Sequence, residues 1–161
     1  MSSETKSPVK LTFLGTGTSH GVPVMTCYCA VCTSQQAEDK RLRSSVMVEK
    51  GTTRIVIDVG PDFRTQMLRE KVDKVDAVLI THEHRDHIAG VDDIRVYNYR
   101  TQAPLDFYCV PRVEREIRQA FAYIFEGHAY PGLPSVSFHN FDEEAFTVGE
   151  LEILPIPVMH Y

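Results

Sequence analysis

One short segment constrains this chain more than any other: His82-Glu83-His84-Arg85-Asp86-His87, which follows the apolar run Ala77-Val78-Leu79-Ile80. Neutral imidazole and carboxylate are good ligands for zinc, iron or manganese, and such ligands are often held on a loop at a strand's end. A solvated polar loop is the alternative, but few structural needs would gather these side chains after a buried strand. The segment therefore predicts a divalent-metal site.

The rest of the chain alternates between strand and helix patterns, which predicts an α/β arrangement. Its 161 residues, 43% apolar and 24% charged, suit one domain spanning residues 1–161. The pattern predicts strands at 10–14, 45–49, 54–59, 77–80 and 105–110, helices at 62–69 and 111–125, and paired strands within 146–158.

Composition indicates in which compartment the protein works and which kind of partner it binds. We find no apolar run that suits a signal peptide or a membrane span, so we expect a cytoplasmic protein with reduced cysteines. The net charge of −5, without a dense basic block, favours a small substrate over nucleic acid.

Three of the four cysteines, Cys27, Cys29 and Cys32, stand close together in sequence. In a reducing compartment such a cluster favours metal binding over disulfide formation. Three thiolates suit one tetrahedral zinc if a fourth ligand comes from elsewhere, and free thiols in a loop are the alternative.

The His-x-His-x-Asp-His segment after a strand resembles the signature of the metallo-β-lactamase superfamily, whose fold is an αββα sandwich. This resemblance implies two divalent ions, zinc or manganese. His82 and His84 would hold one ion together with His160, and Asp86 and His87 would hold part of the other. Asp58 would support the metal loop without binding metal.

The resemblance also implies elements that this sequence does not contain. The superfamily's bridging aspartate and a further histidine have no counterpart before Tyr161, so we expect the N-terminal portion of the sandwich only. An open sheet edge and apolar face would follow, with a homodimer as one way to cover them.

The turn Gly15-Thr16-Gly17-Thr18-Ser19, then Gly21-Val22-Pro23 and the cysteines, is similar to the branch containing the phosphonate-operon cyclic phosphodiesterase and the transfer-RNA 3′-processing nucleases. The segment Gly60-Pro61-Asp62-Phe63-Arg64 strengthens this likeness. The resemblance implies a phosphodiesterase that acts on small or cyclic phosphodiesters with a metal-bound hydroxide, with a structural zinc on the cysteines and Asp86 taking part in proton transfer.

Two other functions remain open from the sequence. The same metal loop supports thioester or lactone hydrolysis, and the pyrroloquinoline quinone biosynthesis protein, a non-hydrolytic metal-binding protein in our interpretation, shares much of the turn and cysteine pattern. Of the remaining candidates, His20 could line the site or simply belong to its turn. We interpret His128, His139 and Cys109 as structural.

Overall fold

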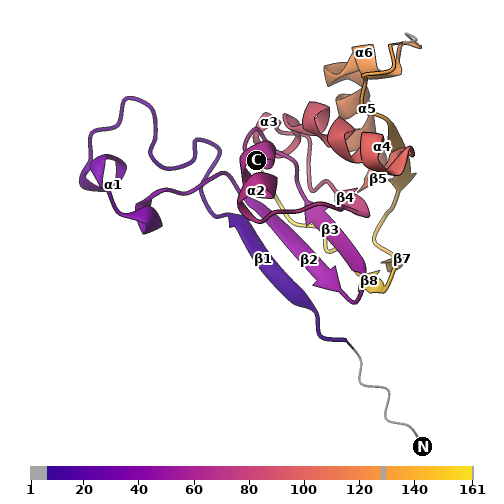
Figure 1. The fold of residues 1–161 in the computed structure, drawn as a ribbon, viewed down its shortest axis with the longest axis horizontal. Helices are drawn as coiled ribbons and strands as arrows, with labels where there is room; N and C mark the ends of the chain where they lie inside the picture. The colour runs from indigo at the N-terminus through magenta and orange to yellow at the C-terminus, as the bar shows by residue number, and fades with distance from the viewer. Residues whose placement is uncertain (1–6, 128–129, 161) are drawn as a thin grey trace, which may run out of the picture.

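The computed structural model describes residues 7–127 and 130–160. A six-stranded sheet in the order β1-β2-β3-β4-β5-β6 forms its centre, and β7 and β8 form a separate antiparallel hairpin (Figure 1). The pairs β1–β2 and β2–β3 are antiparallel, whereas β3, β4, β5 and β6 run parallel. The strands are β1 (Lys10–Gly15), β2 (Ser45–Lys50), β3 (Thr53–Ile57), β4 (Ala77–Leu79), β5 (Leu105–Cys109), β6 (Val136–Asn140), β7 (Phe146–Val148) and β8 (Leu151–Ile153).

Helices fill the connections between the parallel strands, because parallel neighbours cannot be joined by a tight turn. They pack on one face of the sheet (Figure 1). In the described residues, no helix is long and apolar enough to cross a membrane. The helices are α1 (Ala30–Thr33), η1 (Ala37–Asp39), α2 (Phe63–Arg69), α3 (Arg85–Ile88), η2 (Val91–Ile94), α4 (Arg95–Thr101), α5 (Pro111–Ala120) and α6 (Ala122–Phe125).

The inner strands β3 and β4 are buried on both faces, which explains their nearly continuous apolar sequences. Val56 and Val78 belong to the large core under the helices. Ile55 and Ala77 point to the opposite face, where they pack in a smaller core with Val148 and other residues of the β7–β8 hairpin. The predicted mixed α/β architecture around a central sheet is confirmed.

Several local predictions were wrong in their boundaries. The helix predicted at 111–125 divides into α5 and α6 at Phe121, whose backbone is non-helical (φ −123°, ψ 40°). Strand β3 ends at Ile57 because Asp58 turns into the left-handed region (φ 65°). Strand pairing within 146–158 stops at Ile153, and the sequence patterns did not predict β6 or α4.

The segment between β1 and β2 projects from the sheet as an arm that carries α1 and η1 (Figure 1). Isolated bridges Gly17↔Arg43 and Val22↔Arg41 pair the outgoing and returning parts of this arm. A cation also anchors its base: the Arg43 guanidinium pairs with the Asp62 carboxylate at 3.0 Å, and its Nε donates to the Ser19 carbonyl. The glycine-rich turn is thereby tied to the residue that precedes α2.

Candidate metal centre

The His82–His87 segment leaves the carboxyl end of the short parallel strand β4 and enters α3, for which His84 is the N-cap residue. The sequence predicted a loop here, and the structure shows that its second half is the first turn of a helix. The turn places Asp86 and His87 next to each other, with Asp86 Oδ2 3.3 Å from His87 Nε2. His82 and His84 remain in the extended part before the helix.

Three histidines form a cluster at this strand end. Ring nitrogens of His82, His84 and His160 all lie within 4.8 Å of one another, although His84 and His160 are 76 positions apart in the chain. His84 Nδ1 and His160 Nε2 are separated by 3.2 Å. Two nitrogens that each lie about 2.0–2.1 Å from a tetrahedral zinc would be about 3.3 Å apart, so this separation suits a shared ion.

A buried nitrogen without a partner supports the same interpretation. His82 Nε2 is buried and accepts or donates no hydrogen bond among the described residues. Its other nitrogen, Nδ1, lies 3.0 Å from the Thr81 hydroxyl. Because buried polar atoms usually have a partner, an unpaired imidazole nitrogen beside two other histidines fits a metal ligand.

Asp58 connects both parts of the segment. Its carboxylate accepts hydrogen bonds from the Thr81 amide (2.8 Å) and the Thr81 hydroxyl (2.8 Å), and it lies 2.7 Å from His87 Nδ1. We therefore assign the His87 proton to Nδ1, which leaves Nε2 free to face Asp86. The same logic assigns the His82 proton to Nδ1, donating to the Thr81 oxygen. Asp58 thus orients His87 directly and His82 through Thr81.

The electrostatics differ between these two imidazoles. Burial lowers the pKa of His82, and the neighbouring histidines His87, His160 and His84 lower it further. This shift favours the neutral form that can bind a metal. The hydrogen bond to Asp58 raises the pKa of His87, against the effect of burial. This shift favours the protonated imidazolium, which competes with a metal for His87 Nε2, so the metal affinity there would depend on pH.

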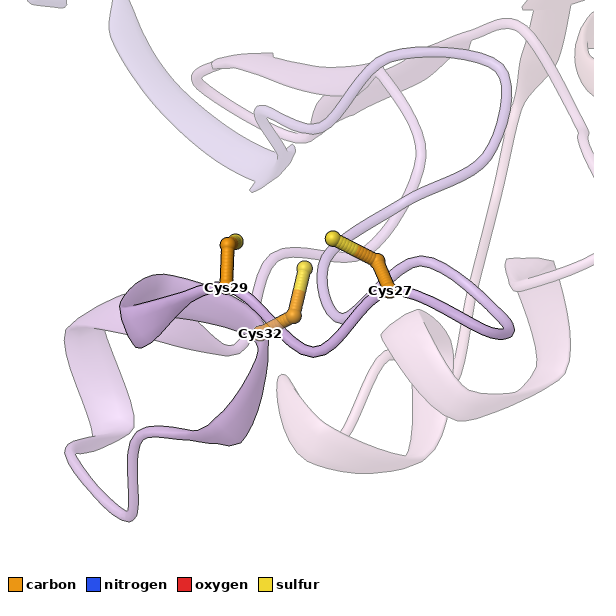
Figure 2. A group of neighbouring side chains, drawn as sticks. All are labelled: Cys27, Cys29 and Cys32. Atoms are coloured by element: carbon orange, nitrogen blue, oxygen red, sulfur yellow. The ribbon is translucent and has the colours of Figure 1, made fainter.

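The cysteines form a second cluster, far along the arm. The sulfurs of Cys27, Cys29 and Cys32 lie within 4.8 Å of one another, and this group includes no fourth ligand atom from the described residues. Figure 2 shows Cys27 on the loop before α1, with Cys29 and Cys32 at the start and in the middle of the helix. The Val24 amide donates to Cys32 Sγ at 3.4 Å.

One of these thiols is activated by its neighbours. A hydrogen bond from the Cys32 backbone, followed by bonds with the Cys27 and Cys32 side chains, lowers the pKa of Cys29 to about 7. A thiolate at Cys29 is thus accessible near neutral pH, and thiolates are the form that binds zinc. The arrangement suits a three-cysteine metal site whose fourth ligand is supplied from elsewhere.

Comparison with known proteins decides the family. Residues 53–161 match the family described as the beta-lactamase superfamily domain, and this range contains His82, His87 and His160. The chain belongs to this family. The arm with its cysteines precedes the matched range, whereas the candidate metal centre lies wholly inside that range.

Individual relatives support a closer grouping. A crystal structure of a diphosphatase from the PhnP family superposes with a TM-score of 0.85 at 40% identity, over 95% of this chain and 58% of that one. The octanoyltransferase of Porphyromonas gingivalis is 40% identical over 149 residues, which are 91% of this chain but 30% of that protein. The chain thus spans a part of each relative.

A third similarity shows the shared fold. The zinc-bound PqqB structure from Methylobacterium extorquens has a TM-score of 0.65 at 22% identity, over 84% of this chain and 47% of that one. The predicted resemblance to the superfamily and to its phosphodiesterase-containing branch is confirmed by these comparisons.

The structure adds two residues that sequence reasoning did not select. These residues are Glu83, one of the two variable positions of the superfamily segment, and Arg112. The Glu83 carboxylate pairs with Arg112 of α5 at 2.6 Å, and its other oxygen is buried without a partner among the described residues. This ion pair ties the metal loop to a neighbouring helix. The only sequence signal was the position of Arg112 immediately after Pro111, which begins that helix.

The other sequence candidates lie outside the histidine cluster. His139 stacks on Tyr108 and lies 2.9 Å from Asp106. Burial raises the pKa of Cys109 to about 12, as expected for an inert core thiol. His20 is exposed in its turn. His128 lies outside the described residues.

Proposed function

We propose that the protein is a metal-dependent hydrolase that acts on small or cyclic phosphodiesters. The observation that carries the proposal is the cluster of His82, His84 and His160 ring nitrogens within 4.8 Å, combined with the buried, unpartnered His82 Nε2. The 40% identical PhnP-family diphosphatase favours phosphoester chemistry over other reactions of the superfamily.

In this proposal the three histidines hold one divalent ion, and Asp86 and His87 supply ligands to a second. Zinc and manganese both suit imidazole and carboxylate ligands. When bound, such ions polarise phosphoryl oxygens and make a water nucleophile available near neutral pH. Further ligands for the second ion would come from the part of the family's fold that this chain does not span, since it covers 58% of the PhnP-family structure.

The chain's own residues have three tasks. Asp58 keeps the protons of His87 and, through Thr81, of His82 on Nδ1, so that both Nε2 atoms stay available to metal. Glu83 and Arg112 hold the loop against α5. Asp86, whose carboxylate faces His87 Nε2, is proposed to receive and release a proton during turnover, with its basicity reduced by any metal it binds.

The cysteine cluster is proposed to hold a structural zinc that stiffens the arm.

We also propose that the protein forms a homodimer. Alternate residues of β1 on the face opposite the helices are exposed: Val9 just before the strand (58%), Leu11 (53%) and Phe13 (65%). An apolar row of this kind would be covered in an assembly.

A second candidate function is acyl hydrolysis, such as thioester cleavage. One observation favours it: the 40% identical Porphyromonas gingivalis relative is named for octanoyl transfer, which is acyl chemistry. The match covers 30% of that protein, so the name describes a much larger molecule. We therefore place this candidate second.

The test compares two substrates on the metal-loaded protein. We expect bis(p-nitrophenyl) phosphate to be hydrolysed faster than a chromogenic thioester, and we expect His84→Ala to lower that rate at least about 100-fold, beyond the usual effect of an outer-shell change. His139→Ala is the control, because His139 is exposed like His84 but pairs with Asp106 outside the cluster.

The outcomes separate the candidates. Faster thioester turnover would favour the acyl hydrolase. Metal bound at the histidines without turnover of either ester would instead support a non-hydrolytic metal-binding protein. Equal losses in His84→Ala and His139→Ala would refute the assignment of the site itself.

A further inference from the structure

A groove of about 590 Å³ runs between α2 and α4, on the helical face of the sheet and away from the histidine cluster. Buried Phe63, Met67 and Tyr97 form part of its lining. Leu68 and Val96 also line it with 61% and 53% of their surfaces exposed. The volume falls within the range of sites that hold small molecules, roughly 300–1,000 Å³.

Cations surround this apolar lining. Arg64 and Lys71 come from α2 and the residues after it, and Arg95 and Arg100 from α4. Arg95 pairs with Asp92 at 3.2 Å. Among the described residues, Arg64, Lys71 and Arg100 have no carboxylate within ion-pair distance. Three cations that make no ion pair among the described residues therefore line one apolar groove.

The two acidic residues of the groove leave this surplus in place. The Asp73 carboxylate already pairs with Arg54 at 3.4 Å, and Asp93 is the other acid in the lining. The groove thus carries more positive than negative charge in a chain whose net charge is −5. A local field of that sign attracts anions, and an apolar floor adds affinity for a hydrocarbon tail.

We propose that the α2–α4 groove binds a single-chain amphiphile with an anionic headgroup, of the size of a medium-chain carboxylate. The headgroup lies among Arg64, Lys71 and Arg100, and the tail packs along Met67, Leu68 and Val96. A fully polar anion would leave the apolar lining uncovered, and an uncharged hydrocarbon would leave the cations uncompensated. This site is independent of the proposed hydrolase activity.

The test titrates sodium octanoate into the protein, with the methionine methyl groups labelled with ¹³C. We expect the Met67 methyl resonance to shift with saturation. Each methylene buried strengthens binding about fourfold, so hexanoate should bind about 15-fold more weakly than octanoate. The Arg64→Gln/Lys71→Gln double variant should bind octanoate about three- to tenfold more weakly at low salt, and n-octanol should bind more weakly than octanoate.

Controls separate this site from charge in general and from the metal centre. Lys50→Gln removes a cation from the end of β2, outside the groove, and should leave the affinity unchanged. Leu68→Glu alters an exposed residue and should abolish binding without unfolding the protein. Repeating the titration with His84→Ala and with chelator excludes a carboxylate bound to metal at the histidines.

Three results would overturn the proposal. Equal affinities for hexanoate and octanoate would show that the tail does not bind in the groove. An equal loss of octanoate affinity in Lys50→Gln and in the double variant would show that the headgroup makes no specific contact with Arg64 and Lys71. Binding to vesicles of anionic phospholipid without binding of monomeric octanoate would identify a membrane-facing surface instead of a ligand groove.

Discussion

Asp58→Asn tests the network that orients the candidate metal ligands. Asp58 is buried, with 5% of its surface exposed, and its backbone has a φ of 65°. Asparagine tolerates this left-handed conformation better than most residues and has nearly the same shape as aspartate. The substitution therefore removes the charge and one acceptor while leaving the turn after β3 in place.

The magnitude follows from the hydrogen bonds. Asp58 Oδ1 accepts from the Thr81 amide at 2.8 Å, and Oδ2 accepts from the Thr81 hydroxyl at 2.8 Å and meets His87 Nδ1 at 2.7 Å. An amide has a single acceptor oxygen, so either Thr81 or His87 faces an NH2 group. Loss of one hydrogen bond to a charged group lowers the free energy of unfolding by about 1.5–3 kcal/mol. Removing the hydrogen-bond acceptor that orients a metal-ligating histidine weakens metal binding by about 10–100-fold.

Two measurements check this reasoning. Denaturant unfolding of the metal-free protein reports the stability, and competition with a chromophoric chelator reports zinc affinity. Asp106→Asn is the control, because Asp106 also pairs with a histidine, His139, but is 45% exposed. Its loss should cost under about 1 kcal/mol and leave zinc affinity unchanged. A zinc affinity of Asp58→Asn within twofold of the parent would refute the orienting role.

Two further substitutions test the sheet and the loop contact. The hydrogen bond from the Lys10 ammonium lowers the pKa of Glu49 most, and Arg54 lowers it further, against the effect of partial burial. The Glu49 carboxylate therefore stabilises the protein above its usual pKa of 4.5. This contribution is lost as the pH falls through the lowered pKa of the folded protein. Glu49→Gln should cost about 1 kcal/mol at neutral pH, with the difference shrinking below about pH 4 in urea titrations; a constant difference would contradict the assignment. A Cβ on Gly60 would overlap the Asp86 carbonyl oxygen. Gly60→Ala should therefore lower the free energy of unfolding by about 1–3 kcal/mol in the same assay and weaken zinc binding. Unchanged stability would show that the metal loop can move away from the new methyl group.

The helix predictions show which signals a sequence carries. Pro111 at the first turn and the buried Val113 and Ile117 at helical spacing identified α5 correctly. The same pattern continued through Ile124, but the structure interrupts the helix at the buried Phe121, whose ring has the Arg85 guanidinium 6.0 Å from its centre. The apolar spacing, which continues across Phe121, gives no signal of this interruption.

The elements missed by sequence reasoning are short and weakly patterned. Strand β6 lies at the sheet edge and has no fully buried residue, and its apolar-polar alternation extends only from Val136 to His139, which is a short signal. Helix α4 has seven residues, too few for a strong periodic signal, and two of them are buried. Both elements take their conformation from β5, against which β6 pairs, and from the core under α4.

Ligand types at fixed spacing, His82 through His87 and Cys27 through Cys32, are local properties of a chain, so the candidate metal chemistry could be predicted from the sequence. Where those groups lie relative to distant residues could be known from the fold alone. It brought His160 to 3.2 Å from His84 and buried Asp58 beneath His87. Contacts between residues far apart in sequence depend on the packing of the whole sheet, and no local pattern encodes their distances.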